Sequence, residues 1–588
     1  MKSIVKTSTL LLTLLSSIIF ATTYNVSGIV QLEDQMIPLG NHSGVKVKFF
    51  NLPSLVAEDS STTNTDGLYS LNISPGYYLV EWTKSGYVPW ELGGLSLAEN
   101  TVLDSITLIP GDVSEVSGTV NSATWTTSFV YYVTDDVTVP AGQTLTINPG
   151  VRVKFLEGKS MTVDGTLLAN GTEDAHVKFT SKDATPLPGD WGNLTLNGEN
   201  NVITYMDYDY ATDGITGASP TGTSIDHLTI QGNLASTANG IKFNEGENYS
   251  LTNNNISIGG TYGIYLYGAN NSDILNNIIT TSNQYGIRAD QSDNSLFDNN
   301  HIVGKPNYGI YSEYNENSTF SNNSLDINQY GLRISYGDSL TIIDNTIELW
   351  GNYGSSVYFN SSENCIIKGN NILINSSYSV YGIRNDNGGS NAIIKNNIIQ
   401  IPNSYNSVEG VRVYDAIIDS NTITLSNSSN MSYIRCIYGG SNTISNNSLN
   451  NQGGYSYCQA IYVSGNENEP NSIINNTINF GFKTDSYSCS AIRASHADIR
   501  NNTIIGTEDY VAQFEGGDVL FIDNYVETND KGLDISNTNT TIKGNTIVTG
   551  ERGIDINNSS TGTIYNNTLV TTSGDYGVYQ SNQTNVGV

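Results

Sequence analysis

A short pattern returns at nearly constant spacing through the second half of the chain, from about residue 250 onward. It consists of an apolar pair, an asparagine, any residue, and then Ile, Leu or Val. The mean period is about 24 residues, a length typical of solenoid repeats. Because a unit of this size cannot bury its apolar face alone, the repeats must stack to form a continuous core. The recurring asparagines are Asn254, Asn277, Asn300, Asn323, Asn345, Asn370, Asn397, Asn421, Asn447, Asn476, Asn502, Asn524, Asn545 and Asn567.

A second element alternates with the first: a small residue followed by Ile, Leu or Val, as at Gly263, Gly286 and Gly309. Short segments rich in β-branched residues favour strands. Strands stacked at about 4.8 Å per turn give each Ile a partner above and below. The leucine-rich horseshoe shares the period, but it requires a Leu pattern that this chain lacks. The sequence therefore predicts an all-β fold whose main part is a long right-handed parallel β-helix.

The recurrent asparagine has a structural explanation. Asn tolerates the left-handed conformation that a corner of the chain requires, and its amide can bond backbone groups of its own and adjacent turns. In register, these residues predict an inward-facing asparagine ladder rather than a row of ligand contacts.

The first turns of the solenoid are expected from residue 114. Segments 145–155, 162–167 and 177–181, with Trp191 and Gly192, resemble the opening turns of secreted β-helix proteins. The later repeats resemble the NosD-like parallel β-helix repeats of the pectate-lyase-like superfamily, so the resemblance covers residues 114–588. It implies the fold but no single activity, because this superfold carries lyases, hydrolases, epimerases, adhesins and structural rods.

Residues 23–110 alternate apolar and polar side chains in short runs between turn residues, which predicts a small N-terminal β-sandwich. Segments 65–71, 75–78 and 86–87 resemble the carboxypeptidase regulatory-like (transthyretin-like) domain. That resemblance implies a non-catalytic accessory or spacer domain. Ligand binding through aromatic side chains such as Trp82 and Trp90 is the alternative.

Residues 1–21 are typical of a secretory signal peptide, since Lys2 and Lys6 precede a short apolar stretch and Ala21 offers a small residue for cleavage. The mature chain is therefore expected to be secreted or on the cell surface, with no membrane insertion after cleavage. The net charge of −31 repels phosphate backbones, so a nucleic-acid partner is not expected. The oligomeric state cannot be read from the sequence.

The residue after each inward Ile is expected to face outward, because side chains alternate along a strand. This outward column contains Arg384 and Arg412, and Asp386 lies on the same face. These three residues are the candidates for a lyase or epimerase site, which needs an Arg base beside carboxylates that hold calcium. Calcium is expected in that case alone, and the sequence predicts no other cofactor or metal. The alternatives are a structural stripe of Arg–Tyr and Arg–Asp contacts, or a sugar-binding face. The column is Lys242, Tyr265, Arg288, Tyr311, Arg333, Tyr358, Arg384, Arg412, Tyr438, Tyr462, Arg493, Asp534, Asp555 and Tyr579.

The spacing from the ladder asparagine to the next small residue indicates where the solenoid carries inserts. It is 9 residues at Asn254 and 8 at Asn524, but 12 to 15 in the five turns between Asn370 and Asn476. Inserts on one side of a solenoid usually build its functional face, and aromatic rings that rise turn by turn suit glycan binding. Packing of Tyr on Tyr without a ligand is the alternative. The candidate glycan-binding residues of this wall are Tyr378, Tyr405, Tyr433, Tyr455, Tyr457 and Tyr487.

Four cysteines are too few for a disulfide framework. Cys458 and Cys489 nevertheless occupy equivalent positions in successive turns, where stacked strands place Cα atoms about 4.8 Å apart. This separation lies within disulfide range and predicts a Cys458–Cys489 bridge. Cys365 and Cys436 fall in different columns and are expected to be unpaired.

Two functions follow from these features. The favoured hypothesis is a secreted or cell-surface rod that contacts glycans or a surface protein through its β-helix. The alternative is a polysaccharide-active enzyme, a lyase or epimerase acting on an acidic polysaccharide. The sequence favours the first. None of its five histidines stands in the Gly-His-Gly motif of pectinolytic hydrolases on this fold, and the signatures of the lyases on this fold are not found either.

Overall fold

A computed structural model describes residues 23–35, 40–52, 54–183, 185–233, 238–375, 378–386, 391–402, 406–426, 433–452, 457–481, 489–506, 510–581 and 585–587. The signal peptide expected at residues 1–21 lies outside this range. The chain divides into two compact units, Met1–Ser114 with Ser128–Val130, and Glu115–Thr127 with Tyr131–Val588. Among the residues that the structure describes, no helix has the length and apolar character needed to cross a membrane.

The first unit is built from short strands in two small sheets. Its elements are β1 (Tyr24–Leu32), the 3-10 helix η1 (Glu33–Gln35), β2 (Lys46–Asn51), β3 (Val56–Thr62), β4 (Leu68–Ile73), β5 (Gly76–Thr83), β6 (Trp90–Leu97), β7 (Thr101–Val102) and β8 (Ile106–Leu108). β1 pairs with β4, β7 and β8, and the other sheet has the order β3-β2-β5-β6. Alternate side chains of both sheets fill one core that includes Val26, Phe49, Val80 and Trp82. The expected N-terminal β-sandwich is confirmed.

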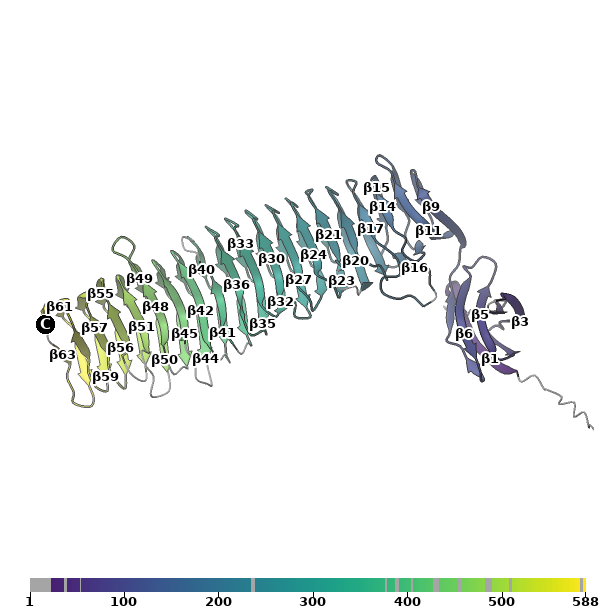
Figure 1. Cartoon of the computed structure of the whole chain (residues 1–588). Coiled ribbons are helices and arrows are strands. Elements are labelled where there is room, and N and C mark those ends of the chain that lie inside the picture. The colour runs from purple at the N-terminus through teal and green to yellow at the C-terminus, as the bar shows by residue number, and fades with distance from the viewer. Residues whose placement is uncertain are drawn as a thin grey trace, which may run out of the picture. The chain divides into compact units, whose positions relative to one another are not determined.

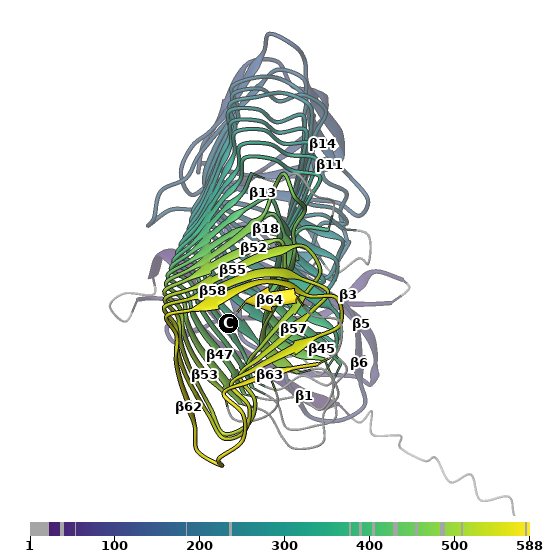
Figure 2. The same cartoon turned by 90° about the vertical axis from the view of Figure 1, so that its left-hand side faces the viewer.

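The second unit is a β-solenoid of about 18 turns, seen from its side in Figure 1 and turned toward its C-terminal end in Figure 2. Strands pair with the equivalent strands one turn away, and the pairing is parallel from the first full turns to the last. The first turns contain β9 (Asp112–Thr119), β10 (Ala123–Trp125), β11 (Phe129–Val139), β12 (Thr144–Ile147), β13 (Arg152–Phe155), β14 (Met161–Val163), β15 (Thr166–Asn170), β16 (Val177–Ser181), β17 (Leu194–Leu196), β18 (Val202–Asp209), β19 (Ile215–Gly217) and β20 (Ser224–Asn233).

From β21 onward, the turns build three long sheets, here named A, B and C in the order in which the chain visits them. Sheet A contains the repeated small residue and Ile. It comprises β21 (Ile241–Asn244), β24 (Tyr262–Tyr267), β27 (Tyr285–Asp290), β30 (Tyr308–Glu313), β33 (Tyr330–Ser335), β36 (Gly354–Asn360), β39 (Val380–Arg384), β42 (Ser407–Tyr414), β45 (Tyr433–Gly440), β48 (Cys458–Ser464), β51 (Ser490–Ser495), β54 (Ala512–Glu515), β57 (Leu533–Ser536), β60 (Ile554–Asn557) and β63 (Val578–Gln580).

Sheets B and C lie on either side of the ladder asparagine. Sheet B comprises β22 (Ser250–Thr252), β25 (Asp273–Leu275), β28 (Leu296–Asp298), β31 (Thr319–Ser321), β34 (Thr341–Ile343), β37 (Ile366–Lys368), β40 (Ile393–Lys395), β43 (Ile417–Asp419), β46 (Thr443–Ser445), β49 (Asn471–Ile474), β52 (Ala497–Arg500), β55 (Asp518–Ile522), β58 (Asn539–Lys543), β61 (Thr561–Tyr565) and β64 (Asn585–Gly587). Sheet C comprises β23 (Asn255–Ile258), β26 (Ile278–Thr280), β29 (His301–Val303), β32 (Ser324–Ile327), β35 (Thr346–Leu349), β38 (Asn371–Ile374), β41 (Ile398–Ile401), β44 (Thr422–Ser426), β47 (Ser448–Gln452), β50 (Thr477–Gly481), β53 (Thr503–Gly506), β56 (Tyr525–Thr528), β59 (Thr546–Thr549) and β62 (Thr568–Thr571).

The interior of the solenoid is a stack of apolar side chains in register. In sheet A, Ile264 lies opposite Ile287, which lies opposite Ile310 in the next turn, and all three are fully buried. Burial of such a side chain contributes about 1.5–3 kcal/mol relative to its exposure to water. No turn could bury these residues without its neighbours, so the core exists only because the turns stack.

The asparagine ladder is confirmed and lies at the corner between sheets B and C. From Asn254 to Asn567, the side-chain Nδ2 of each asparagine donates to Oδ1 of the next, at 2.8–3.1 Å. The same Oδ1 also accepts the backbone N–H of the preceding ladder residue, as from Asn254 to Asn277 at 3.1 Å. Nδ2 donates in addition to a strand carbonyl of the previous turn, as from Asn277 to Leu251 at 2.9 Å. Each amide therefore joins three successive turns.

The left-handed conformation at this corner belongs to a different residue from the one expected. The residue before each ladder asparagine has a positive φ, for example 55° at Asn253 and 57° at Asn276, whereas no ladder asparagine does. The expectation that the ladder residue itself adopts this conformation was wrong. The chain reverses one residue earlier, and this places the following amide inside the solenoid, where it meets the next turn.

Asn370→Ala should destabilise the solenoid by about 3 kcal/mol or more, because each buried polar group left without a partner costs about 1–3 kcal/mol. Asn370 accepts from the amide N–H and the side chain of Asn345 and donates to Ile342 and Asn397, all at 2.9–3.0 Å. The midpoint of unfolding in guanidinium chloride measures the effect. Asn371→Ala, at the exposed neighbouring position, is the control and should change stability by less than about 0.5 kcal/mol. Equal midpoints for the two variants would contradict the role of the ladder.

Candidate functional site

The structure aligns the outward column of sheet A turn by turn. Tyr265 lies opposite Arg288, Arg288 opposite Tyr311, and Tyr311 opposite Arg333. The same register continues through Arg384 and the later members to Tyr579. One further residue, Gln513, stands between Arg493 and Asp534 and was missed because it is neither aromatic nor charged.

A second outward column runs beside the first, because the strict alternation of side chains breaks at the small residue. In β24, Gly263 and Ile264 are both buried, so Tyr262 and Tyr265 lie on the outer face although they are three residues apart. Their rings stack at 4.9 Å between centroids. A simple two-residue period could not reveal this column.

Tyrosines of the second column stack on one another along the solenoid. The ring centroids of Tyr262, Tyr285, Tyr308 and Tyr330 are separated by 5.2, 4.9 and 5.4 Å in successive turns, with interplanar angles of 15° or less. Guanidinium groups lie among the rings, as at Arg333, whose Cζ is 5.2–5.7 Å from four tyrosine centroids. Such cation–π and ring contacts use the ring faces within the protein. This part of the stripe therefore offers a sugar little ring surface.

Arg384, Asp386 and Arg412 are brought together in a network that also holds Glu409 and Arg435. Nε of Arg384 donates to Oδ1 of Asp386 at 2.8 Å. Arg412 lies 3.4 Å from the same carboxylate and 3.7 Å from Glu409, and Arg435 lies 3.1 Å from Glu409. Three guanidinium groups therefore share two carboxylates, and the rings of Tyr381 and Tyr438, from the first and the third of these turns, pack against the guanidinium groups.

This network keeps its arginines cationic. Burial opposes the charge of Arg384, but the hydrogen bond to Asp386 raises the pKa of Arg384 above its ordinary value. Burial likewise opposes the charge of Arg412, and Glu409 and Asp386 raise the pKa of Arg412. A catalytic base must accept a proton in the reaction, so it must first be neutral. The arrangement stabilises the opposite state.

A second acidic residue of sheet A has an unusual environment. Burial raises the pKa of Asp290 to about 6, against the opposing effect of Arg288, whose Nε donates to Asp290 at 2.8 Å. The carboxylate of Glu313 in the next turn adds to the increase. Asp290 is 6% exposed, so it is a buried titrating group rather than an accessible acid.

Three tyrosines of the predicted wall lie at the corner where the chain passes from sheet C to sheet A. Tyr378, Tyr433 and Tyr457 are 40–42% exposed there. Tyr433 and Tyr457 stack at 5.1 Å. Tyr405, Tyr455 and Tyr487 lie outside the described residues.

Two more exposed aromatic residues occupy this corner and were missed by the sequence analysis. Trp350 and Tyr353 are 40% and 57% exposed, and the rings of Tyr353 and Tyr378 lie 4.9 Å apart with an interplanar angle of 53°. Nζ of Lys305 lies 3.9 Å from the Trp350 ring centroid. The available signal was the spacing in this turn, which already reaches 11 residues from Asn345 to Ser356.

We give the name C–A corner to five residues that lie between sheets C and A or at the first residue of a sheet A strand: Trp350, Tyr353, Tyr378, Tyr433 and Tyr457. The corner between sheets A and B carries an exposed aromatic pair of its own. Tyr314 and Tyr336 are 51% and 49% exposed, but their rings stack nearly parallel at 4.9 Å. The rings of Tyr353 and Tyr378 are instead tilted by 53°, so the two faces do not lie flat on each other.

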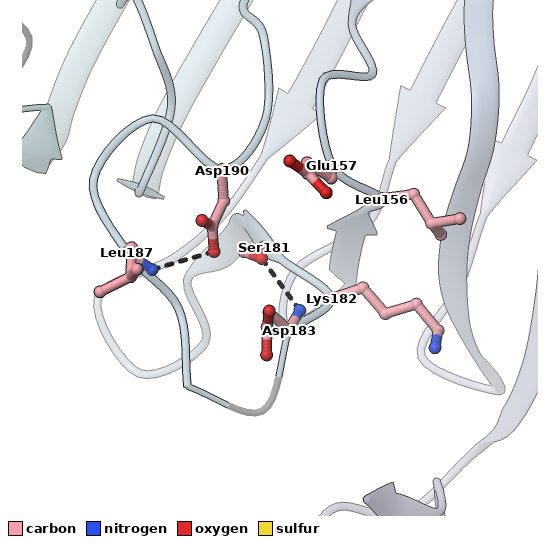
Figure 3. A pocket seen from close by; sticks show the side chains of 7 residues that line it. All are labelled: Leu156, Glu157, Ser181, Lys182, Asp183, Leu187 and Asp190. Carbon is pink, nitrogen blue, oxygen red and sulfur yellow. Dashed lines mark hydrogen bonds between the residues drawn. The ribbon is translucent and has the colours of Figure 1, made fainter. Parts of the chain in front are cut away.

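A pocket of about 390 Å³ lies beside the first turns, between the ends of β13 and β16 and the segment before Trp191 (Figure 3). Some polar side chains of its lining accept hydrogen bonds from backbone amides of the lining segments themselves. The amide of Asp183 donates to Ser181, and the amide of Leu187 donates to Asp190, both at 2.9 Å. The pocket lining is Leu156, Glu157, Ser181, Lys182, Asp183, Leu187 and Asp190. Within the described part of the chain, no three His, Cys, Asp or Glu side chains are placed to hold a metal ion.

The structure places Cys458 and Cys489 in adjoining turns. Gln459 lies opposite Ser490, so the two cysteines that precede them face each other, and the amide N–H of Cys458 is 3.3 Å from Sγ of Cys489. Cys365 lies elsewhere, with its Sγ near the carbonyl of Glu363, and burial raises its pKa to about 12. Burial also raises the pKa of Cys436.

Comparison with known families gives two matches. The family described as right handed beta helix region matches residues 213–372 and 436–588, and the pectate-lyase like beta helix domain matches residues 118–216. No curated protein matches the sequence.

Comparison with solved structures gives matches at low TM-scores. The match to a type II cohesin–X-dockerin complex from Acetivibrio cellulolyticus covers 15% of this chain, at 20% identity and a TM-score of 0.13. It covers 59% of the chain in that complex, which is less than two thirds of its length. The catalytic domain of a GH87 alpha-1,3-glucanase in complex with tetrasaccharides covers 92% of this chain and 86% of its own, at 14% identity and a TM-score of 0.21. The surface protein and adhesin PfbA of Streptococcus pneumoniae covers 80% and 91%, at 11% identity and a TM-score of 0.21. At these scores the likenesses carry no argument.

The Cys458–Cys489 bridge remains a prediction with a direct test. After alkylation without reductant and proteolysis, the peptides that contain the two cysteines should be found by mass spectrometry as one disulfide-linked species. Reduction should separate this species into the two peptides. Cys365 and Cys436, alkylated after unfolding in the same sample, serve as the internal control. Alkylation of all four thiols before reduction would contradict the bridge.

Asp290→Asn should make stability less dependent on pH between about 4 and 6. The folded-state pKa of Asp290 lies above its unfolded value, so the free energy of unfolding of the wild-type protein falls as pH rises through this window and stays lower above it. The variant has no titrating group at this position, so its free energy of unfolding does not fall for this reason. Relative to the wild type, it should gain about 1–3 kcal/mol between pH 4 and pH 7.5, as measured by chemical unfolding.

Asp273→Asn, an exposed position of sheet B in the turn before Asp290, is the control for this experiment. Its pH profile should follow the wild type. Parallel profiles for the wild type and Asp290→Asn would show that Asp290 titrates as an ordinary surface carboxylate.

Proposed function

Because the chain belongs to the right-handed β-helix family, whose stacked turns form a rigid rod, we propose that it is a secreted or cell-surface protein that binds carbohydrate along the C–A corner. The observation that carries this proposal is the exposure of five aromatic side chains at one corner. Aromatic rings offer sugars an apolar face, and exposed clusters of such residues commonly mark binding surfaces.

The placement of the C–A corner supports the same function. Its aromatic residues lie in, or directly after, the connections that lengthen between Asn345 and Asn476. Lengthened loops on one side of a solenoid are where binding surfaces form. The sheets beside them keep their register, since Leu332 pairs with Val357 and Val357 with Ile383. The rings therefore rest on a rigid frame, which reduces the entropy lost on binding.

The N-terminal unit is proposed to be a carboxypeptidase regulatory-like spacer, and the solenoid a NosD-like member of its superfamily. Tyr78 and Trp82 support the spacer role, because both are at most 1% exposed and fill the core of the sandwich. The signal peptide expected at residues 1–21 underlies the proposed secretion. A surface protein as the partner of the rod is the alternative within this function.

The lyase or epimerase alternative gains no support from its candidate residues. Arg384 and Arg412 are bonded to Asp386 and Glu409, and those contacts hold both guanidinium groups in the protonated state. The same carboxylates are engaged by arginine rather than open to calcium. We therefore retain the non-enzymatic function.

Glycan-array binding by the mature protein tests the proposal. Tyr353→Ala with Tyr378→Ala should weaken binding about tenfold to a hundredfold, because an aromatic contact contributes about 0.5–1.5 kcal/mol. Tyr314→Ala with Tyr336→Ala is the matched control, since it removes an equally exposed pair from the A–B corner. An equal effect of both pairs, or no glycan bound by the wild type, would refute the proposed site.

A further inference from the structure

Beside the C–A corner, sheet C presents a row of uncharged side chains, one in each turn. Leu373 lies opposite Gln400, Gln400 opposite Thr424, and Thr424 opposite Asn450. Gln400 is exposed and the other three are half-buried. The aromatic residues of the corner follow in the same turns, with Tyr378 after Leu373, Tyr433 after Thr424 and Tyr457 after Asn450.

The same column carries acids in the preceding turns. Asp326 lies opposite Glu348, and Glu348 lies opposite Leu373. The charge therefore ends at the turn in which the row of uncharged side chains begins. A polyanion that extended along the corner would meet these two carboxylates, whereas an uncharged chain would not be repelled.

The charges on the other flank, in sheet A, are already matched. Glu409 and Arg435 lie 3.1 Å apart, with 2% and 12% of their side chains exposed. Nε of Arg435 also donates to Gln459 at 3.1 Å. Arg384 and Arg412 contact Asp386, as described above. These arginines serve the internal network. Lys305, whose side chain reaches the C–A corner, lies on the Trp350 ring.

From this arrangement we infer that the ligand of the C–A corner is an uncharged, linear polysaccharide that runs along the solenoid axis; this inference rests on the proposed function. Gln400, Thr424 and Asn450 supply amide and hydroxyl groups for hydrogen bonds to sugar hydroxyls. Tyr378 and the exposed parts of the stacked pair Tyr433 and Tyr457 supply the apolar contacts. Successive turns rise by about 4.8 Å, which is close to the length of one pyranose unit in an extended chain. One sugar can thus meet one turn.

The overall charge of the molecule favours the same class of ligand. A net charge of −31 repels uronate and sulfated chains at long range. An uncharged chain experiences no such electrostatic repulsion, so the affinity for it should be insensitive to ionic strength. The attraction of a polyanion to a local basic patch would instead weaken as salt screens the charges.

The test uses the full mature chain and soluble probes: neutral glucan and mannan oligosaccharides of increasing length, and oligogalacturonates of the same lengths. Neutral oligosaccharides of one of these series should bind, with affinity rising at least tenfold between two and six sugars. Their affinity should change less than twofold between 50 mM and 500 mM salt. Oligogalacturonates should bind at least tenfold more weakly.

A triple variant probes the row itself. Gln400→Ala with Thr424→Ala and Asn450→Ala should weaken binding of the neutral six-sugar ligand by at least tenfold. Thr422→Ala with Ser448→Ala is the matched control, because these exposed residues lie opposite each other at the far end of the same strands. The control should bind as the wild type does, and circular dichroism spectra of both variants should match that of the wild type.

The outcomes separate this inference from the proposed function. Preferential, salt-sensitive binding of oligogalacturonates at the corner would overturn the inference and leave a carbohydrate-binding rod in place. Affinity independent of length, or a triple variant that binds normally, would also overturn it. Failure of the wild type to bind any glycan would refute the proposed function and this inference together.

Discussion

The solenoid depends on the requirement that a buried amide find hydrogen-bond partners inside the protein. Each ladder asparagine donates to the next carboxamide and to a strand carbonyl, and its oxygen accepts two N–H groups from the preceding turn. These bonds form only when adjacent turns share one register, so the ladder fixes the register of sheets B and C together. An apolar residue in this column would fill space, but it would leave backbone N–H groups at the corner without an acceptor.

On the outer face of sheet A, charged residues of successive turns lie close together, and each needs a partner within the protein. Arginines alternate with tyrosines or meet carboxylates of the same or the neighbouring turn. Arg288 meets Asp290 within one strand, and Arg435 meets Glu409 of the turn before it. The guanidinium groups are consequently matched by contacts within the protein. Most of the arginine and acidic side chains that a catalytic or anion-binding site on this face would need are therefore already paired with one another. The exposed residues described at the C–A corner are aromatic, and the row beside them in sheet C is uncharged.

The solenoid separates stability from recognition because its connections can lengthen without disturbing its sheets. Between Asn345 and Asn476 the passage from sheet C to sheet A gains several residues, yet the inward column of sheet A continues through Val357, Ile383 and Val411. The backbone hydrogen bonds of the sheets hold the frame. The corner is then free to carry residues such as Tyr353 that contribute little to the core.

The sequence by itself determined the stacked architecture, the ladder and the inward columns, because each of these is a local requirement repeated at a fixed period. It also placed Arg384 and Arg412 on the outer face. Only the tertiary structure decided that Glu409 and Arg435 join them, since these residues occupy a second outward column created where the alternation breaks at Gly410. The structure also showed that the residue before each ladder asparagine adopts the left-handed conformation, and that Trp350 and Tyr353 are exposed at the C–A corner. The physical reason is the same in each case: a period predicts which side of the strand a residue occupies, whereas contacts between turns depend on the register and on the path of the connections, which are set when the turns stack.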